Sequence, residues 1–217
     1  MLSLREELRA LPVLSSVPHP FDTSRAPDAP QELFIDWFRQ AVAAGESEPH
    51  AMTLSTSDAE GRPDARVLIL KDLDDQGWWF ASSSMSRKGR QLEQQPAAAL
   101  TFYWPTLGRQ IRIRGTMLTA SAERAASDFR ARGLGARAVA LASRESEPLA
   151  DLSECTHAVM AARKALETDP GIVSHTWALY SVYPDQVEFW QADPDRLHTR
   201  LRYSRSGPSW ERTLLWP

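Results

Sequence analysis

Near the end of the chain, two cations and an imidazole occur at alternate positions, at Arg196, His198 and Arg200. Side chains of an extended strand alternate between its two faces, so a strand over residues 197–202, running in from Arg196, would place all three groups on one face. Groups of this kind repel one another when charged, unless an anionic or electron-rich group lies against them. The spacing therefore predicts a ligand-binding face, at which His198 could take or give a proton near neutral pH.

A second basic group stands where a helix over residues 86–95 would begin. Ser86 is the expected N-cap of this helix, and Arg87 and Lys88 follow it directly. Free backbone N–H groups and the positive end of the helix dipole favour a bound anion at such a position. The segment is therefore either a phosphate site or a solvated basic turn, and its residues alone leave both interpretations open.

Arg66 and Lys71 flank an apolar run that predicts a buried strand over residues 66–71. A charge beside buried apolar residues needs a partner or solvent. Strict alternation puts these two cations on opposite faces, where they would touch different parts of a ligand unless a bulge intervenes. Both could also simply reach solvent at the strand ends.

A strand predicted over residues 110–118 has one polar face, which begins with Gln110. The amide of Gln110 can donate and accept hydrogen bonds, as recognition of a heterocycle edge requires. Arg112 and Arg114 share that face, and we expect both to be exposed to solvent.

The elements that must position these residues are mainly strands. Apolar periodicity and turn residues predict strands over residues 52–56, 66–71, 78–82, 99–104, 110–118, 176–182, 186–191, 197–202 and 209–215, and helices over residues 31–44, 86–95, 122–132 and 156–166. Short turns and the absence of regular strand–helix alternation predict a mainly β fold, an antiparallel barrel with added helices. We expect one domain over residues 31–217, preceded by a mobile or wrapping arm over residues 1–30.

Composition excludes several classes of protein. A net charge of −3 over 217 residues gives no global basic footprint, so no nucleic-acid partner is expected. No apolar run is long enough to span a bilayer, and the first residues do not form a signal peptide, so we expect a cytoplasmic protein without a membrane partner. Cys155 is the single cysteine, which excludes an intrachain disulfide and a cysteine-based zinc site; no metal site is expected.

In their order and spacing, these motifs resemble the pyridoxamine 5′-phosphate oxidase family of FMN enzymes, from about Trp37 to Pro217. The resemblance implies an FMN-binding split β-barrel and a homodimer that binds FMN at the subunit interface. It rests on six segments, which are Glu48–Met52, Arg66–Lys71, Ser86–Gly89, Arg109–Gln110, Glu188–Gln191 and Arg196–Arg200.

The resemblance also implies a role for individual residues. It assigns FMN to Arg66, Val67, Leu68, Ile69, Leu70, Lys71, Ala81, Ser82, Arg87, Lys88, Gln110, Glu145, Ser146, Trp190 and Arg200. It assigns the substrate to Lys71, Arg132, Arg196 and His198, with Arg196 and His198 as the catalytic pair. Enzymes of this family pass a hydride from a substrate C–H to FMN, and O2 then reoxidises the flavin and yields H2O2.

The sequence departs from the family where the substrate phosphate is expected. The family combines a Lys, a Tyr, an Arg and a Ser there; this chain keeps Lys71 and Arg132 but has Asp128 and Ala136 at the other two positions. A carboxylate repels a phosphate dianion, and two hydroxyl donors are lost. The family's Gln-Ser pair is also changed, to Glu145 and Ser146.

Three functions therefore remain open. The first is oxidation of a vitamin B6 phosphate, and the second is oxidation of a reduced secondary metabolite, as in the phenazine-biosynthesis branch of the superfamily. The third is a non-catalytic protein that binds a flavin or pyridoxal phosphate. Arg196 and His198 argue against the third, because binding of a flavin alone does not require them.

Overall fold

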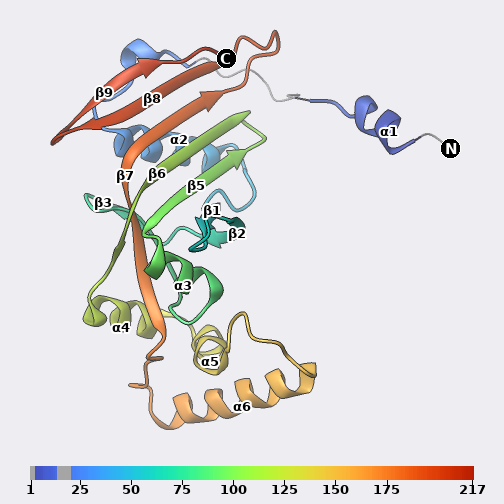
Figure 1. The fold of residues 1–217 in the computed structure, drawn as a ribbon, viewed down its shortest axis with the longest axis vertical. Helices are drawn as coiled ribbons and strands as arrows, with labels where there is room; N and C mark the ends of the chain where they lie inside the picture. The colour runs from blue at the N-terminus through green and yellow to red at the C-terminus, as the bar shows by residue number, and fades with distance from the viewer. Residues whose placement is uncertain (1–2, 14–20) are drawn as a thin grey trace. The chain divides into compact units, whose positions relative to one another are not determined.

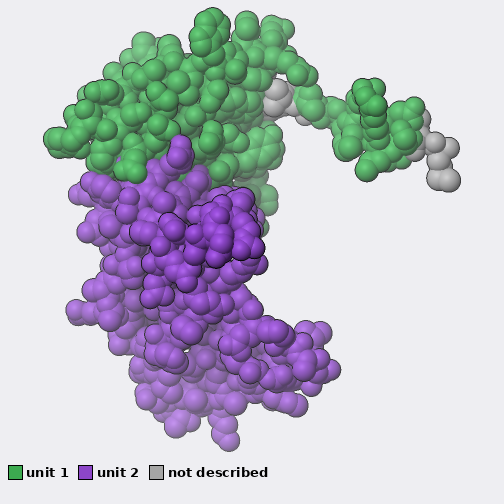
Figure 2. All heavy atoms as spheres, viewed as in Figure 1, with its two compact units in different colours: residues 1–52, 101–113, 185–217 green, residues 53–100, 114–184 purple. Residues whose placement is uncertain are grey.

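The structure of the protein, a computed structural model, describes residues 3–13 and 21–217 (Figure 1). These residues form two compact units, coloured separately in Figure 2. Unit 1 comprises the described residues of 1–52 together with 101–113 and 185–217, and unit 2 comprises residues 53–100 and 114–184. Within the predicted arm, residues 14–20 lie outside the described residues.

The described elements agree with a mainly β fold that carries several helices. The helices are α1 (Leu4–Ala10), the short 3-10 helix η1 (Thr23–Arg25), α2 (Pro30–Ala43), α3 (Arg87–Gln94), α4 (Ala122–Ala131), α5 (Leu134–Ala142) and α6 (Leu152–Thr168). The strands are β1 (Ala51–Ser57), β2 (Pro63–Ile69), β3 (Asp72–Asp74), β4 (Gly77–Ser83), β5 (Ala97–Trp104), β6 (Arg109–Thr119), β7 (Trp177–Gln191), β8 (Thr199–Ser206) and β9 (Ser209–Leu214).

All nine of these strands belong to one sheet. Its main path runs β2-β1-β5-β6-β7-β4-β3, and β8 pairs with β7 and β9. The pairs β3–β4, β4–β7, β7–β8 and β8–β9 are antiparallel. The two strands predicted over residues 176–182 and 186–191 are a single strand, β7, which pairs with β4 along its first part and with β8 along its last part.

Unit 1 has an aromatic core beneath α2. Phe34 and Trp37 are buried on one face of this helix, as the helical spacing predicts. The Phe34 ring packs edge-on against that of Phe102, with centroids 5.0 Å apart, and the Trp37 ring packs edge-on against that of Phe189, with centroids 5.2 Å apart. These contacts hold α2 against β5 and the last part of β7.

Residues 21–29 of the predicted arm pack against α2, β8 and β9 within unit 1. The hydroxyl of Tyr203, on β8, donates a 2.7 Å hydrogen bond to the carbonyl of Pro27, and Arg212, on β9, donates to the carbonyl of Ala26. Phe21 contacts Trp37 edge-on at 4.9 Å. This part of the arm therefore follows the surface of the unit.

Unit 2 is built around β4 and the first part of β7. Trp78, Trp79 and Phe80 of β4 are almost completely buried, because helices and neighbouring strands cover them. Trp79 forms a core cluster with Ala125 of α4 and Leu179 of β7. Helices α5 and α6 lie side by side (Figure 1), and α5 was not predicted from the sequence.

Two strand predictions are wrong. The strand over residues 66–71 is not buried: β2 lies at the end of the sheet path, and Val67 and Ile69 are 65% and 42% exposed. The strand predicted over residues 197–202 begins at Thr199 instead, because residues 193–198 form a turn. Within residues 3–13 and 21–217, no helix is long and apolar enough to cross a membrane.

Candidate active site

The segment predicted as a phosphate site or a solvated basic turn lies at the start of α3, in unit 2. Ser86 caps the helix: its hydroxyl accepts the Gly89 N–H at 3.1 Å and donates to the Ser83 carbonyl at 2.7 Å. Lys88, in the first turn, is only 6% exposed. The bend of the chain is therefore fixed by a buried serine, and a lysine is held in the interior beside it.

Gly89 explains how α3 approaches the end of β4 so closely. A Cβ atom at this position would lie 2.3 Å from the carbonyl oxygen of Ser84 and 2.6 Å from that of Ser83. Those oxygens belong to the backbone and cannot move aside as a flexible side chain can. Glycine at this position therefore lets the first turn of α3, with its two cations, press against the strand.

Glu145 and Ser146 contact the start of this helix. Lys88 Nζ forms an ion pair with Glu145, and the Arg87 N–H donates to Ser146 Oγ at 3.0 Å. Ser146 has a positive φ of 74°, a strained conformation for a residue with a side chain. Such strain at a residue in a cationic cluster is typical of functional sites.

Arg66 extends the cluster from β2. Its guanidinium donates to Thr56 Oγ1 at 2.7 Å and forms an ion pair with Asp64 at 2.8 Å. Arg87 Nε lies 3.5 Å from the same Asp64 carboxylate. Asp64 thus pairs with both arginines. The sequence did not point to this residue directly, although two arginines at one predicted site favour a shared carboxylate partner.

Gln91 carries a buried donor beside this cluster. Its amide oxygen accepts from Thr56 Oγ1 at 2.6 Å and from Arg66 at 3.4 Å. Its amide nitrogen is buried and has no hydrogen-bond partner among the described residues. A buried donor without an acceptor is costly. A free donor on the helix that begins with Arg87 and Lys88, with Arg66 bonded to the oxygen of the same amide, fits the acceptor oxygens of a phosphate-bearing cofactor such as FMN.

A second cluster in unit 2 contains the predicted substrate residues Lys71 and Arg132. Lys71 Nζ forms an ion pair with Asp128, and the other oxygen of that carboxylate accepts the Trp177 indole N–H at 2.9 Å. Arg132 lies over the Trp177 ring at 4.1 Å. Trp177 was not singled out from the sequence, although an aromatic beside two cations is a common ligand-site pattern.

Arg132 is the cation of this cluster that keeps a free donor. One of its terminal nitrogens, Nη1, is buried without a hydrogen-bond partner among the described residues. Burial lowers the pKa of Arg132, and the nearby charge of Asp128 opposes that shift. Ala136 is exposed and offers no hydroxyl, so Arg132 is the group left to hold an anion.

The remaining predicted residues lie in unit 1. Arg200, on β8, donates to Glu188 through Nε and Nη2, at 3.0 and 2.8 Å, and through Nη1 to the Trp216 carbonyl at 2.9 Å. Arg112, expected to face only solvent, also lies 3.7 Å from Glu188. Glu188 therefore orients the predicted flavin contact Arg200, a role that its position in the motif did not reveal.

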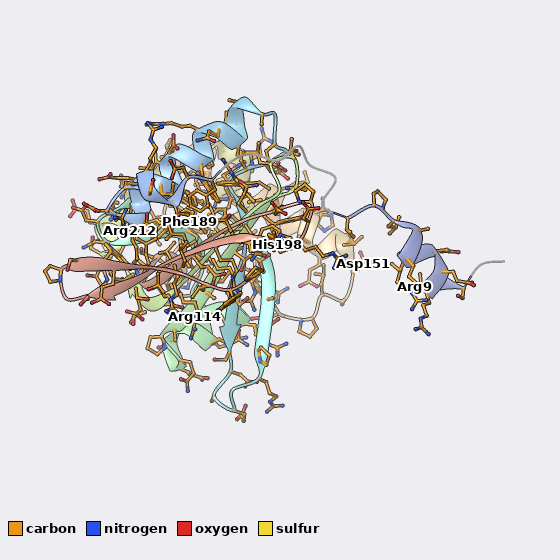
Figure 3. All side chains as sticks on the ribbon, turned by 90° about the horizontal axis from the view of Figure 1, so that it is seen from above. Arg9, Arg114, Asp151, Phe189, His198 and Arg212 are labelled. Carbon is orange, nitrogen blue, oxygen red and sulfur yellow. The ribbon has the colours of Figure 1, made fainter. Side chains whose placement is uncertain are left out.

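His198 lies where the chain enters β8 (Figure 3), beside Trp190. The two rings are 4.8 Å apart between centroids. His198 Nδ1 accepts the backbone N–H of Asp193 at 3.1 Å, so the neutral ring carries its proton on Nε2 and can donate from there. The imidazole is thus held in one tautomer by the turn that precedes the strand.

Arg196, His198 and Arg200 do not share one strand face, so that prediction is wrong. Arg196 has a left-handed backbone with φ of 65° and lies in the turn, while Arg200 alone is on the strand. The physical reason is the Asp193 side chain, which accepts the backbone N–H groups of residues 195 and 197 at 2.8 and 3.3 Å. This local hydrogen bonding competes with extension of the strand.

The other predicted flavin residues differ in how far they are buried. Leu68, Leu70, Ala81, Gln110 and Trp190 are half-buried, Ser82 is buried, and Val67 and Ile69 are exposed. The site predictions thus divide between unit 2, which carries both cationic clusters, and unit 1, which carries Gln110, Trp190, Arg196, His198 and Arg200.

The chain matches known proteins over most of its length. Residues 38–170 match the family described as pyridoxamine 5′-phosphate oxidase, and residues 177–217 match the pyridoxine 5′-phosphate oxidase C-terminal dimerisation region. A pyridoxine/pyridoxamine 5′-phosphate oxidase of Pseudomonas fluorescens Pf-5 is 40% identical over 197 residues, which cover 89% of this chain and 91% of that protein. One of Thermosynechococcus vestitus is 43% identical over 194 residues, covering 89% and 92%.

Solved structures give the same fold. The crystal structure of PhzG from Burkholderia lata 383, in complex with tetrahydrophenazine-1-carboxylic acid, has a TM-score of 0.87 and 31% identity, covering 94% of this chain and all of that one. A related FMN-binding protein of Nostoc punctiforme has a TM-score of 0.71 at 20% identity, covering 87% and 98%, and supports the fold alone. The predicted antiparallel split barrel is confirmed. With both family regions matched across its strands and helices, the chain belongs to the pyridoxamine 5′-phosphate oxidase family of FMN-dependent oxidoreductases.

Proposed function

We propose that the protein is a cytoplasmic, homodimeric oxidase that uses FMN to oxidise pyridoxamine or pyridoxine 5′-phosphate, with O2 as acceptor and H2O2 as product. The observation that carries the flavin part is the cluster at the start of α3. There, Arg87 and Lys88 share α3 with the unsatisfied amide donor of Gln91, and Arg66 bonds the oxygen of the same amide. The named relatives, at about 40% identity over most of the chain, support the B6 substrate.

Within this proposal, Arg66, Arg87 and Lys88 hold the FMN phosphate, and Gln110, Trp190 and Arg200 contact its ring system. FMN supplies the hydride acceptor when it is bound. Arg200, which Glu188 orients, would hold the ring system of bound FMN and would stabilise negative charge on it. Arg196 and His198 bind and orient the substrate, and the Nε2–H of His198 is the group that donates to it.

A homodimer that binds FMN at its interface fits two further observations. Val67 and Ile69 expose apolar surface on β2, the strand at the end of the sheet path that the family resemblance assigns to the flavin. An exposed apolar strand at a sheet edge tends to associate with other chains unless another surface covers it. Residues 177–217 also match a dimerisation region.

A second candidate is oxidation of a reduced ring compound without a phosphate group, such as a dihydrophenazine. Asp128 favours it, because a carboxylate paired with Lys71 stands where the family has a tyrosine hydroxyl donor for the substrate phosphate. Arg132 then remains to bind a single negative charge. PhzG, which was crystallised with tetrahydrophenazine-1-carboxylic acid, is 31% identical to this chain.

One experiment tests the proposal and separates the two candidates. The visible spectrum of the FMN-loaded protein is recorded without oxygen, before and after addition of pyridoxamine 5′-phosphate. Loss of the oxidised flavin spectrum, restored by air, supports the B6 oxidase. An unchanged spectrum together with bleaching by a dihydrophenazine carboxylate supports the second candidate. Failure of the protein to bind FMN refutes both.

A further inference from the structure

Arg109 and Gln191 form a buried pair that the proposed mechanism does not use. Arg109 begins β6 and Gln191 ends β7, and each is only 3% exposed. Arg109 Nε donates to Gln191 Oε1 at 2.9 Å. Gln191 Nε2 donates in turn to the carbonyls of Leu107 and Gly108, at 3.0 and 3.2 Å. One side-chain pair therefore ties the ends of two neighbouring strands together.

Keeping a guanidinium in this interior has a cost. Its hydrogen-bond acceptors are neutral amide oxygens, Gln191 Oε1 and Gln40 Oε1, each at 2.9 Å. The guanidinium carbon, Cζ, lies 4.2 Å from the centre of the Trp37 ring. Burial lowers the pKa of Arg109 to about 10, while the charge of Asp36 acts in the opposite direction. The residue is thus charged at neutral pH, and an apolar side chain could fill such a space without desolvating a charge.

The register of the two strands gives this pair its significance. The N–H of Ala192 donates to the carbonyl of Gly108 at 2.8 Å, and that of Ala120 donates to Leu179 at 2.9 Å, so β6 and β7 run antiparallel. Because Ala192 pairs with Gly108, the next residues along the two strands, Arg109 and Gln191, lie opposite each other. One residue further along each strand, Gln110 therefore lies opposite Trp190.

Gln110 and Trp190 project from the other face of these strands, because side chains alternate along a strand. Both are half-buried, in contrast to their buried neighbours Arg109 and Gln191. They are also the two residues of β6 and β7 expected to contact the flavin ring. A change of register by one residue would exchange the faces and remove both from the site.

We propose that Arg109 and Gln191 are positioning residues, which fix the register of β6 against β7 from the buried face and thereby set Gln110 and Trp190 against the flavin. The inference rests on the proposed flavin site. It requires no direct contact between the pair and FMN. Because it concerns the ring contacts, it holds for either candidate substrate.

The test compares two variants that each remove a 2.9 Å bond to the same guanidinium, and Gln191→Met also removes the bonds that Gln191 donates to the Leu107 and Gly108 carbonyls. Gln191→Met removes the bond to the strand that carries Trp190, and Gln40→Met removes the bond to α2. FMN binding to each apoprotein is measured by quenching of flavin fluorescence, the bound flavin by its visible spectrum, and folding by thermal unfolding without FMN. Arg114→Met, an exposed change on β6, serves as the control for the strand.

We expect Gln191→Met to raise the FMN dissociation constant by about tenfold and to alter the visible spectrum, as loss of supporting contacts around a ligand site does. Gln40→Met and Arg114→Met should leave the FMN dissociation constant within about twofold of wild type and the visible spectrum unchanged. Equal effects of Gln191→Met and Gln40→Met, or no effect of either, would overturn the proposal. Wild-type protein that binds no FMN would instead overturn the proposed function on which it rests.

Arg109→Lys provides a second readout that a merely structural role would not give. Lysine keeps the charge beside Trp37 but lacks the planar fork that bonds Gln191 and Gln40 together. We expect a folded protein with near wild-type thermal unfolding and a flavin spectrum shifted as in Gln191→Met. A wild-type spectrum in Arg109→Lys would also count against positioning by the pair.

Discussion

Asp128 gives the sharpest prediction, because it places a fixed negative charge where a substrate phosphate is expected. The change is Asp128→Asn, which keeps an oxygen to accept the Trp177 N–H and removes only the charge. Lys71 then loses its ion-pair partner and becomes available to a ligand anion. Binding of pyridoxamine 5′-phosphate should therefore become tighter.

The size of the effect follows from Coulomb's law. Two unit charges about 4 Å apart interact by about 1 kcal/mol in water and about 4 kcal/mol at the effective dielectric constant of a protein surface. The side chains of Lys71 and Asp128 are 28% and 17% exposed, so solvent partly screens their charges. Their interaction energy therefore lies nearer the lower of these two values. Removal of the carboxylate charge should then strengthen phosphate binding by about 1–2 kcal/mol, or about 5–30-fold.

The assay is titration of FMN-loaded protein under anaerobic conditions, with pyridoxamine 5′-phosphate and with pyridoxamine. Only the phosphorylated ligand should gain affinity in Asp128→Asn. The exposed change Asp75→Asn in the same unit is the matched control and should alter neither ligand. Equal or weaker binding of the phosphate ester by Asp128→Asn would refute the reasoning and mean that the phosphate lies elsewhere.

Three further changes test other parts of the molecule. Lys88→Met should raise the FMN dissociation constant about 10–100-fold in a fluorescence titration, because a charge-assisted hydrogen bond is lost, whereas Arg90→Met on the same helix should not. His198→Ala should lower kcat about 100-fold in steady-state oxygen consumption while the FMN dissociation constant stays within about threefold; loss of the flavin would contradict the substrate role. Burial raises the pKa of Tyr203 from 10.0 to about 12, so its contribution to stability is complete below pH 10.0 and is lost as the pH rises towards 12. Denaturant titrations across this range should show that loss in wild type, whereas Tyr203→Phe should lack it and be less stable at pH 7 by about 1 kcal/mol, since the bond to Pro27 is gone.

Local signals in the sequence were sufficient for part of this structure. Helix α2 and the N-cap at Ser86 depend on side chains within one or two turns, and both are confirmed. The turn before β8 was also local, but the hydrogen bonds of Asp193 were not recognised, so Arg196 and His198 were placed on a strand. Strand alternation then predicted a shared face that does not exist.

Other features depend on residues far apart in the chain. Asp128 was recognised as a departure from the family, but its ion pair with Lys71 spans 57 positions, and no spacing rule relates the two. The exposure of β2 likewise follows from its place in the sheet path, since the run Val67–Leu70 is as apolar as that of a central strand. Burial and partners outside the local segment need the tertiary structure.

Gly89 has a consequence for the mutational tolerance of the family site. In most helices, alanine is favoured over glycine by about 1 kcal/mol, so a stabilising library would routinely introduce it. At Gly89 the added methyl group meets backbone oxygens at 2.3 and 2.6 Å, and the preference reverses. A deep mutational scan should therefore find this helix position as restricted as the cations beside it, although it contributes no functional group of its own.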